Sequence, residues 1–258
     1  MDAIVTAGGI PDEKDLLYPL TRGGPKALLP IGGKPMIQWV LDALSDAKCI
    51  ERVVVVGLSE ESGLSCTKPL SFLPNQGSML ANIFAGAQKI LTDNPSAGVL
   101  FSISSDIPAL TAGMVDWMAG EVGAGEFDVY YNFITRDAME SRFPGSKRTY
   151  TRFKDIEVCG GDLTAFRSAM LTTDDGVWQE LINSRKNVLK QAAVIGYGTL
   201  LLLLLRQLTI EDAVARVSKR LELRARAVRC PYPEIGMDVD KPAQLALLEN
   251  DLASRGLA

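Results

Sequence analysis

Two stretches near the start of the chain have residue types and spacing suited to phosphate binding. Residues 3–9, AIVTAGG, are an apolar run that ends in small residues, so an anion can approach the backbone N–H groups there. Residues 19–37, PLTRGGPKALLPIGGKPMI, hold Lys26 between a proline and an alanine, just after a glycine pair. Proline restricts the backbone at this point, and a lysine ammonium is a compact charge that suits triphosphate oxygens. Together the two stretches indicate a phosphate site.

Three aspartates are candidate ligands of a hard metal ion. Asp106 directly follows an apolar run in SSDIPAL, and Asp238 and Asp240 lie in GMDVDKP before the last helical pattern. Mg²⁺ prefers carboxylate oxygens and leaves coordination positions for water and phosphate. Taken alone, Asp106 fits a turn or helix-cap residue before Pro108 better than a metal ligand, and Asp240 fits a helix cap better. Their occurrence together with the Lys26 stretch favours a metal and phosphate site.

Composition excludes several other chemistries. The chain has no histidine, which removes histidine-based triads, dyads and metal sites. Its four cysteines form no CxxC pair and are expected to be reduced thiols. A net charge of −4 without a basic tail argues against nucleic-acid binding. The leucine-rich run over 194–205 is far shorter than the ~20 residues of a membrane span, so we expect it to form a buried helix. With no signal-peptide pattern, the sequence predicts a cytoplasmic protein.

Alternating strand and helix patterns position these residues. Apolar runs and helical spacing predict strands over 3–6, 52–57, 98–103 and 127–134 and helices over 36–44, 78–91 and 111–122. The later part predicts short strands over 149–153, 156–159 and 224–229, several helices between 161 and 221, and a last helix over 242–253 capped by Asp240. We expect one α/β domain over 1–258, a Rossmann-like three-layer sandwich with a mostly parallel central sheet and ligands at the carboxyl ends of its strands.

The opening of the chain resembles a known family. AIVTAGG followed by PLTRGGPKALLPIGGKPMIQWVLDAL is similar to the signature of nucleotidyltransferases with the GT-A-like fold, which include MobA-like NTP transferases and sugar-phosphate nucleotidylyltransferases. The resemblance implies a Mg²⁺-dependent enzyme that transfers NMP from an NTP to a small phosphorylated acceptor and releases pyrophosphate. It also implies a nucleotide-binding half over 1–125 and an acceptor-binding half over 126–258.

Matching positions in the family imply roles for individual residues. Lys26 corresponds to the catalytic lysine that contacts the nucleotide phosphates, and Asp106 to the aspartate that binds the catalytic metal. The second metal ligand corresponds to Asp238 or Asp240. The turn that cradles the nucleotide and the segment that meets its base correspond to Ala7, Gly8 and Gly9, and to Gly77 and Ser78. A phosphate acceptor is already ionised at neutral pH, which agrees with a chain that lacks histidine.

The acceptor side is predicted from a basic stretch, 147–154. If it forms a strand, Arg148 and Arg152 share one face and can meet a phosphate, although a solvated basic hairpin is an equal alternative. Gly161 lies in a Gly-Gly-Asp segment that resembles a substrate-side loop of some relatives. The sequence leaves open the base, the acceptor, and whether the apolar segment 198–205 is core or an interface in a homo-oligomer.

One departure from the family signature bears on activity. Family members usually carry Gly-x-Gly-x-Arg after the first strand, whereas here IPDEKDLLY follows Gly9, so the loop is longer and the arginine is missing. Lys14 and Arg22 are the candidates to replace its charge. Two alternatives therefore stand beside the transferase: a glycosyltransferase of related fold that uses a nucleotide-sugar, and a non-enzymatic nucleotide sensor.

Overall fold

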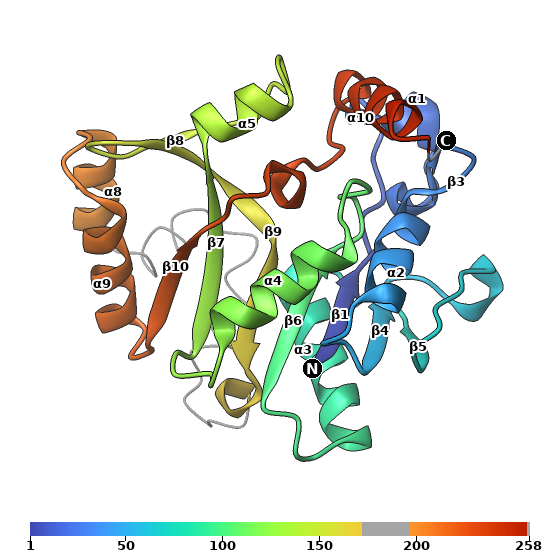
Figure 1. The fold of residues 1–258 in the computed structure, drawn as a ribbon, viewed down its shortest axis with the longest axis horizontal. Helices are drawn as coiled ribbons and strands as arrows, with labels where there is room; N and C mark the ends of the chain where they lie inside the picture. The colour runs from blue at the N-terminus through green and yellow to red at the C-terminus, as the bar shows by residue number, and fades with distance from the viewer. Residues whose placement is uncertain (172–196, 257–258) are drawn as a thin grey trace.

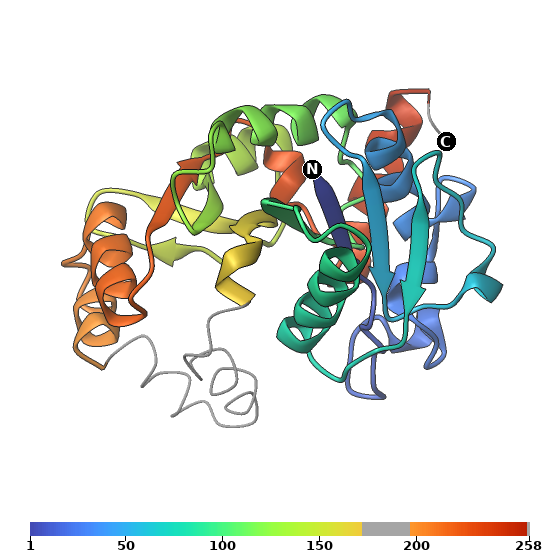
Figure 2. The same ribbon diagram turned by 90° about the horizontal axis from the view of Figure 1, so that it is seen from below.

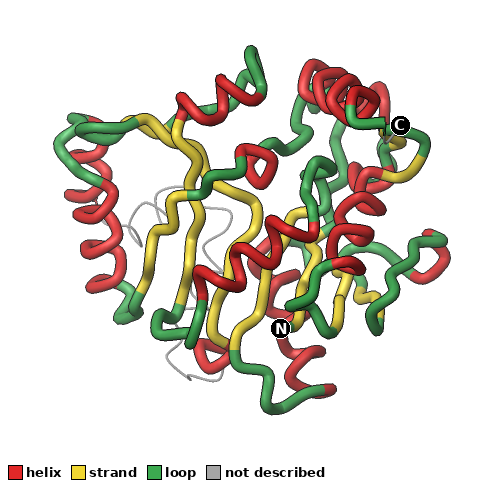
Figure 3. The backbone as a smooth tube through the Cα atoms, viewed as in Figure 1, coloured by secondary structure: helices red, strands yellow, loops and turns green. Residues whose placement is uncertain are grey.

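The computed structural model describes residues 1–171 and 197–256, and a large sheet runs through its centre (Figure 1, Figure 3). The strands of this sheet are β1 (Asp2–Thr6), β4 (Arg52–Val56), β5 (Leu70–Leu73), β6 (Val99–Ser104), β7 (Val129–Thr135), β8 (Thr151–Arg152), β9 (Glu157–Arg167) and β10 (Ala225–Arg229). A small hairpin is formed by β2 (Pro30–Ile31) and β3 (Lys34–Pro35). The described α-helices are α1 (Tyr18–Thr21), α2 (Met36–Asp46), α3 (Met79–Asp93), α4 (Ala112–Val122), α5 (Arg136–Arg142), α8 (Tyr197–Leu204), α9 (Ile210–Arg220) and α10 (Pro242–Ser254).

The sheet is mixed but mostly parallel. Its order is β10-β7-β9-β6-β1-β4-β5, and β8 pairs with β9. The pairs β1–β4, β1–β6, β4–β5 and β7–β10 are parallel, whereas β9 runs antiparallel to β6, β7 and β8. The predicted α/β fold with a mostly parallel central sheet is confirmed.

Apolar cores lie on opposite faces of the sheet, because successive side chains of a strand point to opposite faces. Ala3 and Val5 of β1 belong to a larger core that includes residues of α2 and α4, while Ile4 between them belongs to a smaller core with Ala87 and Ile90 of α3. Figure 2 shows α3 on the opposite side of the sheet from α2 and α4. This is the predicted three-layer arrangement.

The second half of the chain departs from the prediction. Residues 157–167 form one long strand, so the expectation of a short strand over 156–159 is wrong. Of the helices expected between 161 and 221, α8 and α9 are present among the described residues, but the chain is still a strand at 161–167. Gly160 and Gly161, which the resemblance assigns to a loop, lie inside β9, where a Cβ on Gly161 would lie 3.0 Å from Asn132 Oδ1. Glycine serves here to let neighbouring groups approach closely. The helices expected over 172–196 lie outside the described residues.

The leucine-rich run forms helix α8, but its end is not buried. Leu204 is 79% exposed and Leu205 is 55% exposed, so the prediction of a buried helix is wrong at this end. Consecutive leucines place apolar side chains all round a helix, whereas α8 lies at the edge of the fold beside β8 and can bury only one side (Figure 1). None of the helices in the described ranges is long and apolar enough to cross a membrane.

The segment before α10 also differs from the prediction in one detail. The N-cap residue is Lys241, and no side chain caps this helix, so the predicted capping by Asp240 is wrong. The backbone N–H of Asp240 donates to Gln244 Oε1 at 2.8 Å instead. The Asp240 carboxylate is therefore available for contacts with the rest of the fold.

Turns at the carboxyl ends of β1 and β4 lie against each other. The N–H of Ala7 donates to the carbonyl of Val56 at 2.8 Å. Gly57 follows at φ +116°, a backbone conformation that favours glycine, and a Cβ at this position would collide with the backbone of Gly8. The close approach of the two turns therefore requires glycine at position 57.

We predict that Gly57→Ala lowers the free energy of unfolding by about 2–4 kcal/mol, because it combines backbone strain with a backbone collision. Gly63→Ala is the matched control: its φ is +68°, but a Cβ there meets open space, so the expected loss is about 1–2 kcal/mol. Urea unfolding of both variants gives the comparison. An equal loss of unfolding free energy in the two variants would contradict the predicted collision at position 57.

Candidate functional site

The Lys26 segment is attached to the turn after β1. Pro25 is extended and Ala27 is buried, so the short 3₁₀ turn Lys26–Leu28 is anchored on both sides of the lysine. The backbone N–H of Lys26 donates to the carbonyl of Gly9 at 2.9 Å. The glycine turn and the lysine, 17 positions apart in the chain, are thereby brought to the same place, as the sequence predicts.

The ammonium of Lys26 lies between two carboxylates. Its Nζ is 2.6 Å from Asp106 Oδ2 and 2.6 Å from Asp240 Oδ1, and the lysine side chain is largely buried. Burial by itself would lower the pKa of Lys26, but attraction to Asp106 and Asp240 outweighs it and the net shift is upward. Lys26 therefore carries its positive charge throughout the neutral pH range.

Three aspartates converge beside this lysine. Carboxylate oxygens of Asp106, Asp238 and Asp240 lie within 4.8 Å of one another. The backbone N–H of Val239 donates to the Asp106 carbonyl at 3.0 Å, which holds the segment before α10 against the end of β6. Ser104 donates its hydroxyl to Asp106 Oδ1 at 2.5 Å and orients that carboxylate. A cluster of carboxylate oxygens fits a hard cation such as Mg²⁺, and Asp238 and Asp240 both belong to it.

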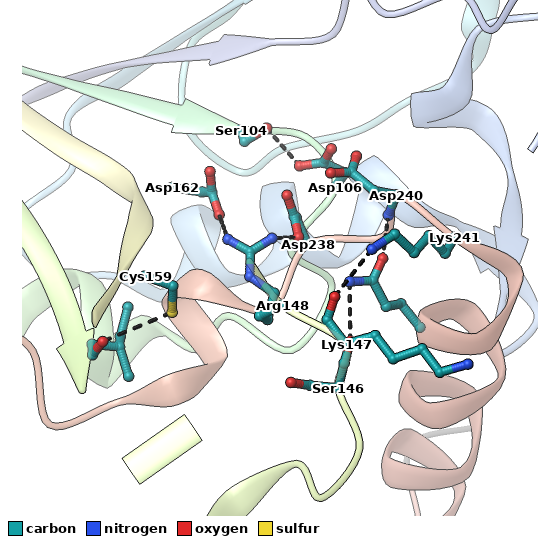
Figure 4. A network of polar contacts seen from close by, with 12 residues as sticks. Ser104, Asp106, Ser146, Lys147, Arg148, Cys159, Asp162, Asp238, Asp240 and Lys241 are labelled. Carbon is teal, nitrogen blue, oxygen red and sulfur yellow. Dashed lines mark hydrogen bonds and ion pairs between the residues drawn. The ribbon is translucent and has the colours of Figure 1, made fainter. Parts of the chain in front are cut away.

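Arg148 is the second cation of the site. Figure 4 shows its guanidinium between Asp162 and Asp238. It is hydrogen-bonded to Asp238 and lies 3.9 Å from Asp162 Oδ2. The loop that carries Arg148 is tied to α10, because Gln244 Nε2 donates to the Ser146 carbonyl at 3.2 Å. Among the described residues, the Nε of Arg148 has no hydrogen-bond partner, although it is buried.

Negative charge exceeds positive charge in this network. Four carboxylates, those of Asp106, Asp162, Asp238 and Asp240, surround the ammonium of Lys26 and one guanidinium. Burial raises the pKa of Asp162 to about 7, repulsion from Asp106 adds to the rise, and the guanidinium opposes it. The excess negative charge also favours a bound divalent cation.

A cavity of about 270 Å³, which we call the Lys26 cavity, opens between this lysine and the start of α3. Its lining includes these predicted residues: Gly8, Gly9, Lys26, Gly77, Ser78 and Asp106. Ala7, also predicted to bind the nucleotide, is buried and is not among the described residues that line this cavity. Ser78 also caps α3, since its hydroxyl accepts the N–H of Ala81 at 3.2 Å. Residues that the sequence predicts to bind the nucleotide therefore come from separate segments of the chain and line the same cavity.

Two asparagines that the prediction missed organise the wall of this cavity. Asn82 is 3% exposed; its Oδ1 accepts the N–H of Gln76 at 2.7 Å and its Nδ2 donates to Asn75 Oδ1 at 3.2 Å. Asn75 Nδ2 in turn donates to the Gly8 carbonyl at 2.9 Å. The sequence carries one signal for this network, an asparagine at position 82 within a run, 79–87, whose other residues are apolar or glycine.

A second cavity of about 510 Å³, which we call the α3 cavity, lies on the α3 side of the sheet. Arg148 and Gly161, both predicted to bind the acceptor, line it. Arg152 does not; its Nε pairs with Glu157 Oε1 at 2.8 Å. Strand β8 covers only 151–152, so the condition for Arg148 and Arg152 to share a strand face is not met. Instead β8 pairs with the start of β9 in an antiparallel hairpin and Arg152 is exposed, as in the alternative of a solvated hairpin. The two cavities adjoin, because both are lined by Thr6 and Ser104.

The candidate replacements for the missing arginine lie elsewhere. Neither Lys14 nor Arg22 is among the described residues that line the Lys26 cavity. Arg22 ends helix α1 in a left-handed conformation with φ 51°. In the described part of the chain, the cations that pair with the aspartates of the site are therefore Lys26 and Arg148.

Known structures share this arrangement of strands and helices. A hypothetical transferase from Thermus thermophilus aligns with a TM-score of 0.79 at 32% identity, over 95% of this chain and 98% of that chain. CMP:2-keto-3-deoxy-manno-octonic acid synthetase, in a structure complexed with CTP, aligns with a TM-score of 0.61 at 16% identity over 98% of both chains. The chain therefore shares its fold with this transferase and with the synthetase.

Sequence comparisons identify the family of the chain. Residues 20–140 match the MobA-like NTP transferase domain. Mannose-1-phosphate guanylyltransferase regulatory subunit alpha of Dictyostelium discoideum is 38% identical over 63 residues, which are 24% of this chain and only 15% of that protein. Together with the full-length similarity to the Thermus transferase, these matches confirm the resemblance: the chain belongs to the MobA-like NTP transferase family.

The raised pKa of Asp162 predicts a pH-dependent stability effect. The folded carboxyl holds its proton up to about pH 7 and the unfolded one releases it near 3.8, so its stabilising contribution is complete below 3.8 and is lost as pH rises through 7. In metal-free buffer, Asp162→Asn should therefore melt higher than wild type at pH 8.5, and the difference should shrink at pH 5. Asp155→Asn controls for removal of an exposed charge. A difference that does not vary with pH would contradict the assignment.

Proposed function

We propose that the protein transfers a nucleoside monophosphate from an NTP to a small phosphorylated acceptor and releases pyrophosphate. The observation that carries the proposal is Lys26: it reaches Asp106 and Asp240 at 2.6 Å beside a glycine turn to which its own backbone is hydrogen-bonded. Cationic, carboxylate and backbone groups meet at the carboxyl ends of parallel strands, where α/β proteins bind nucleotides. The membership in the family supports the same reaction.

The proposed chemistry needs little from side chains that transfer protons. An oxygen of the acceptor phosphate attacks the α-phosphorus of the NTP, a new P–O bond forms, and the bond to the bridging oxygen breaks as pyrophosphate leaves. A phosphate monoester is ionised at neutral pH, so no general base is required. The protein contributes positioning and charge stabilisation, which suits a chain without histidine.

Each part of the site has a proposed role. The turn at Gly8 and Gly9 and the ammonium of Lys26 hold the triphosphate, and the Gly77–Ser78 segment meets the base. Arg148 binds the acceptor phosphate. Asp106, Asp238 and Asp240 would hold Mg²⁺, which when bound supplies charge neutralisation for the reacting phosphates.

Nucleotide binding without transfer is the second candidate function. The longer loop after Gly9 carries no arginine in the family position, and Lys14 and Arg22 do not line the Lys26 cavity among the described residues. A triphosphate would then be held with less positive charge than the family signature supplies. Turnover separates the two functions.

We predict that pyrophosphate release with one of the four NTPs, Mg²⁺ and a pool of phosphate monoesters falls by about 10²–10³ in Lys26→Ala, because one charge that stabilises the transition state is lost. Lys34→Ala is the matched control. It removes a lysine of the same stretch, but Lys34 pairs with Asp42 and lies 3.5 Å from the centre of the Trp39 ring. Its activity should stay near that of wild type.

The same assay distinguishes the two candidate functions. If no NTP gives pyrophosphate but one of them raises the melting temperature, the protein is a nucleotide sensor. If no NTP does either, nucleotide binding is wrong. Equal losses in Lys26→Ala and Lys34→Ala would contradict the special role of Lys26.

We also predict that Mg²⁺ binds to the three aspartates and competes with the Lys26 ammonium for Asp106 and Asp240. Titration calorimetry with Mg²⁺ should show binding to the wild type, weakened at least about tenfold in Asp238→Asn because one of three carboxylates is lost. Lys26→Met should bind Mg²⁺ more tightly, since the ammonium no longer shares Asp106 and Asp240 with the metal. Asp42→Asn, which lies outside the cluster, is the control. Unchanged affinity in Asp238→Asn would contradict the site.

A further inference from the structure

The α3 cavity changes from polar to apolar along its length. Its floor is formed by β6, β9 and β7, and its wall by α3. The register of β6 against β9 pairs Ser102 with Thr164 and Leu100 with Phe166. Leu100 and Phe166 belong to the smaller core on the α3 side, so these pairs form successive rows on the face that α3 covers.

The polar end of the floor adjoins the charged network. Ser104 and Asp162 lie one row further toward the carboxyl end of β6, and both line the cavity together with Arg148. Asp162 Oδ2 is buried and has no hydrogen-bond partner among the described residues. A donor and an acceptor of hydrogen bonds therefore stand at one end, next to Asp106 and the Lys26 cavity.

The wall formed by α3 is apolar along the cavity, and the floor is apolar at the end away from the charged network. Leu80, Ile83 and Phe84 of α3 line the cavity and are only half-buried, as is Val129 of β7 on the floor. From the row of Ser104 to the row of Leu100 the strand advances about 13 Å. Half-exposed apolar side chains along such a length gain free energy when an apolar ligand covers them.

We propose that the acceptor of the transfer is a phosphate monoester of an apolar alcohol. The phosphate lies at Arg148, and an aliphatic chain runs along α3 toward Phe166. This inference rests on the proposed function, whose acceptor site it specifies. The volume of about 510 Å³ is that of a site for a small organic ligand.

A polyhydroxylated acceptor fits the same cavity poorly. Each hydroxyl that a sugar ring carries into a buried site needs a hydrogen-bond partner, and an unpaired one opposes binding. The lining of the far end is apolar among the described residues and includes Phe84 and Phe166. The hydroxyls that line the cavity lie toward its charged end and its middle, so they can match polar groups near the phosphate but none at the far end. They belong to Thr6, Ser102, Ser104, Tyr131 and Thr164.

The test measures binding of a homologous series to the full chain with Mg²⁺: ethyl, butyl, hexyl and octyl phosphate, with glucose 1-phosphate and ribose 5-phosphate for comparison. Titration calorimetry should show Kd falling by about two- to fourfold for each added methylene until the chain reaches the end of the cavity. The sugar phosphates should bind at least about tenfold more weakly than octyl phosphate.

Variants of the lining test whether this cavity is the site. Phe84→Ser should weaken the dependence of Kd on the length of the alkyl chain. Thr164→Val, which keeps the shape of the side chain and so preserves the packing of β9, should steepen it. Leu20→Ser removes an apolar side chain that is exposed and does not line the cavity, so it should leave the dependence unchanged.

The outcomes separate this inference from the proposed function. A Kd that does not vary with chain length, tighter binding of the sugar phosphates, or no binding of any phosphate overturns the inference. If chain length matters in wild type but Thr164→Val does not change the dependence, the cavity is not the site and the inference also fails. If the alkyl phosphates bind as expected but no NTP gives pyrophosphate, the assignment of the cavity stands and nucleotidyl transfer fails. If pyrophosphate is released with sugar phosphates but not with alkyl phosphates, nucleotidyl transfer stands and the inference about the acceptor fails.

Discussion

The ammonium of Lys26 between two carboxylates is the interaction on which the rest of the site depends. Its partners come from the end of β6 and from the segment before α10, so one cation joins residues 26, 106 and 240. A charge this poorly solvated needs carboxylate partners, and loss of either Asp106 or Asp240 would leave it with one of the two. The backbone bond from Lys26 to Gly9 holds the ammonium in position. These two constraints bring the glycine turn, the lysine and the acidic cluster to one edge of the sheet.

The second organising constraint is the alternation of side chains along the strands. On one face of β6 and β9 apolar residues build the larger core with α2 and α4; on the other face β6 presents Ser104, Ser102 and Leu100 in succession. The antiparallel direction of β9 places Asp162 at the charged end and Phe166 at the apolar end. The register of β6 against β9 therefore makes the α3 cavity polar where it adjoins the Lys26 cavity and apolar at its other end.

The comparison with the family shows where this chain differs. Relatives of similar fold include a synthetase solved with CTP, and the long match to the Thermus transferase covers nearly the whole of both chains. The extended loop after Gly9 nevertheless removes a cation that the family signature places beside the phosphates. In the described residues, Arg148 supplies a second positive charge from the opposite side of the acidic cluster. It lines the α3 cavity and not the Lys26 cavity, so it does not substitute for the missing arginine at the glycine turn.

Local pattern in the sequence determined the strands and helices of the first half and the glycine turn, and it singled out Lys26 and Asp106 as candidates. Apolar periodicity and the restrictions of glycine and proline act over a few residues, so they can be recognised without the fold. The family resemblance named Asp238 and Asp240 as alternatives, and only the tertiary structure shows that both reach the acidic cluster with Asp106. The single strand over 157–167, the separation of Arg152 from Arg148, and the hydrogen-bond partners of Asn82 depend on contacts between segments distant in the chain. Such contacts decide which polar group meets which, since burial and pairing of charge are properties of the assembled fold.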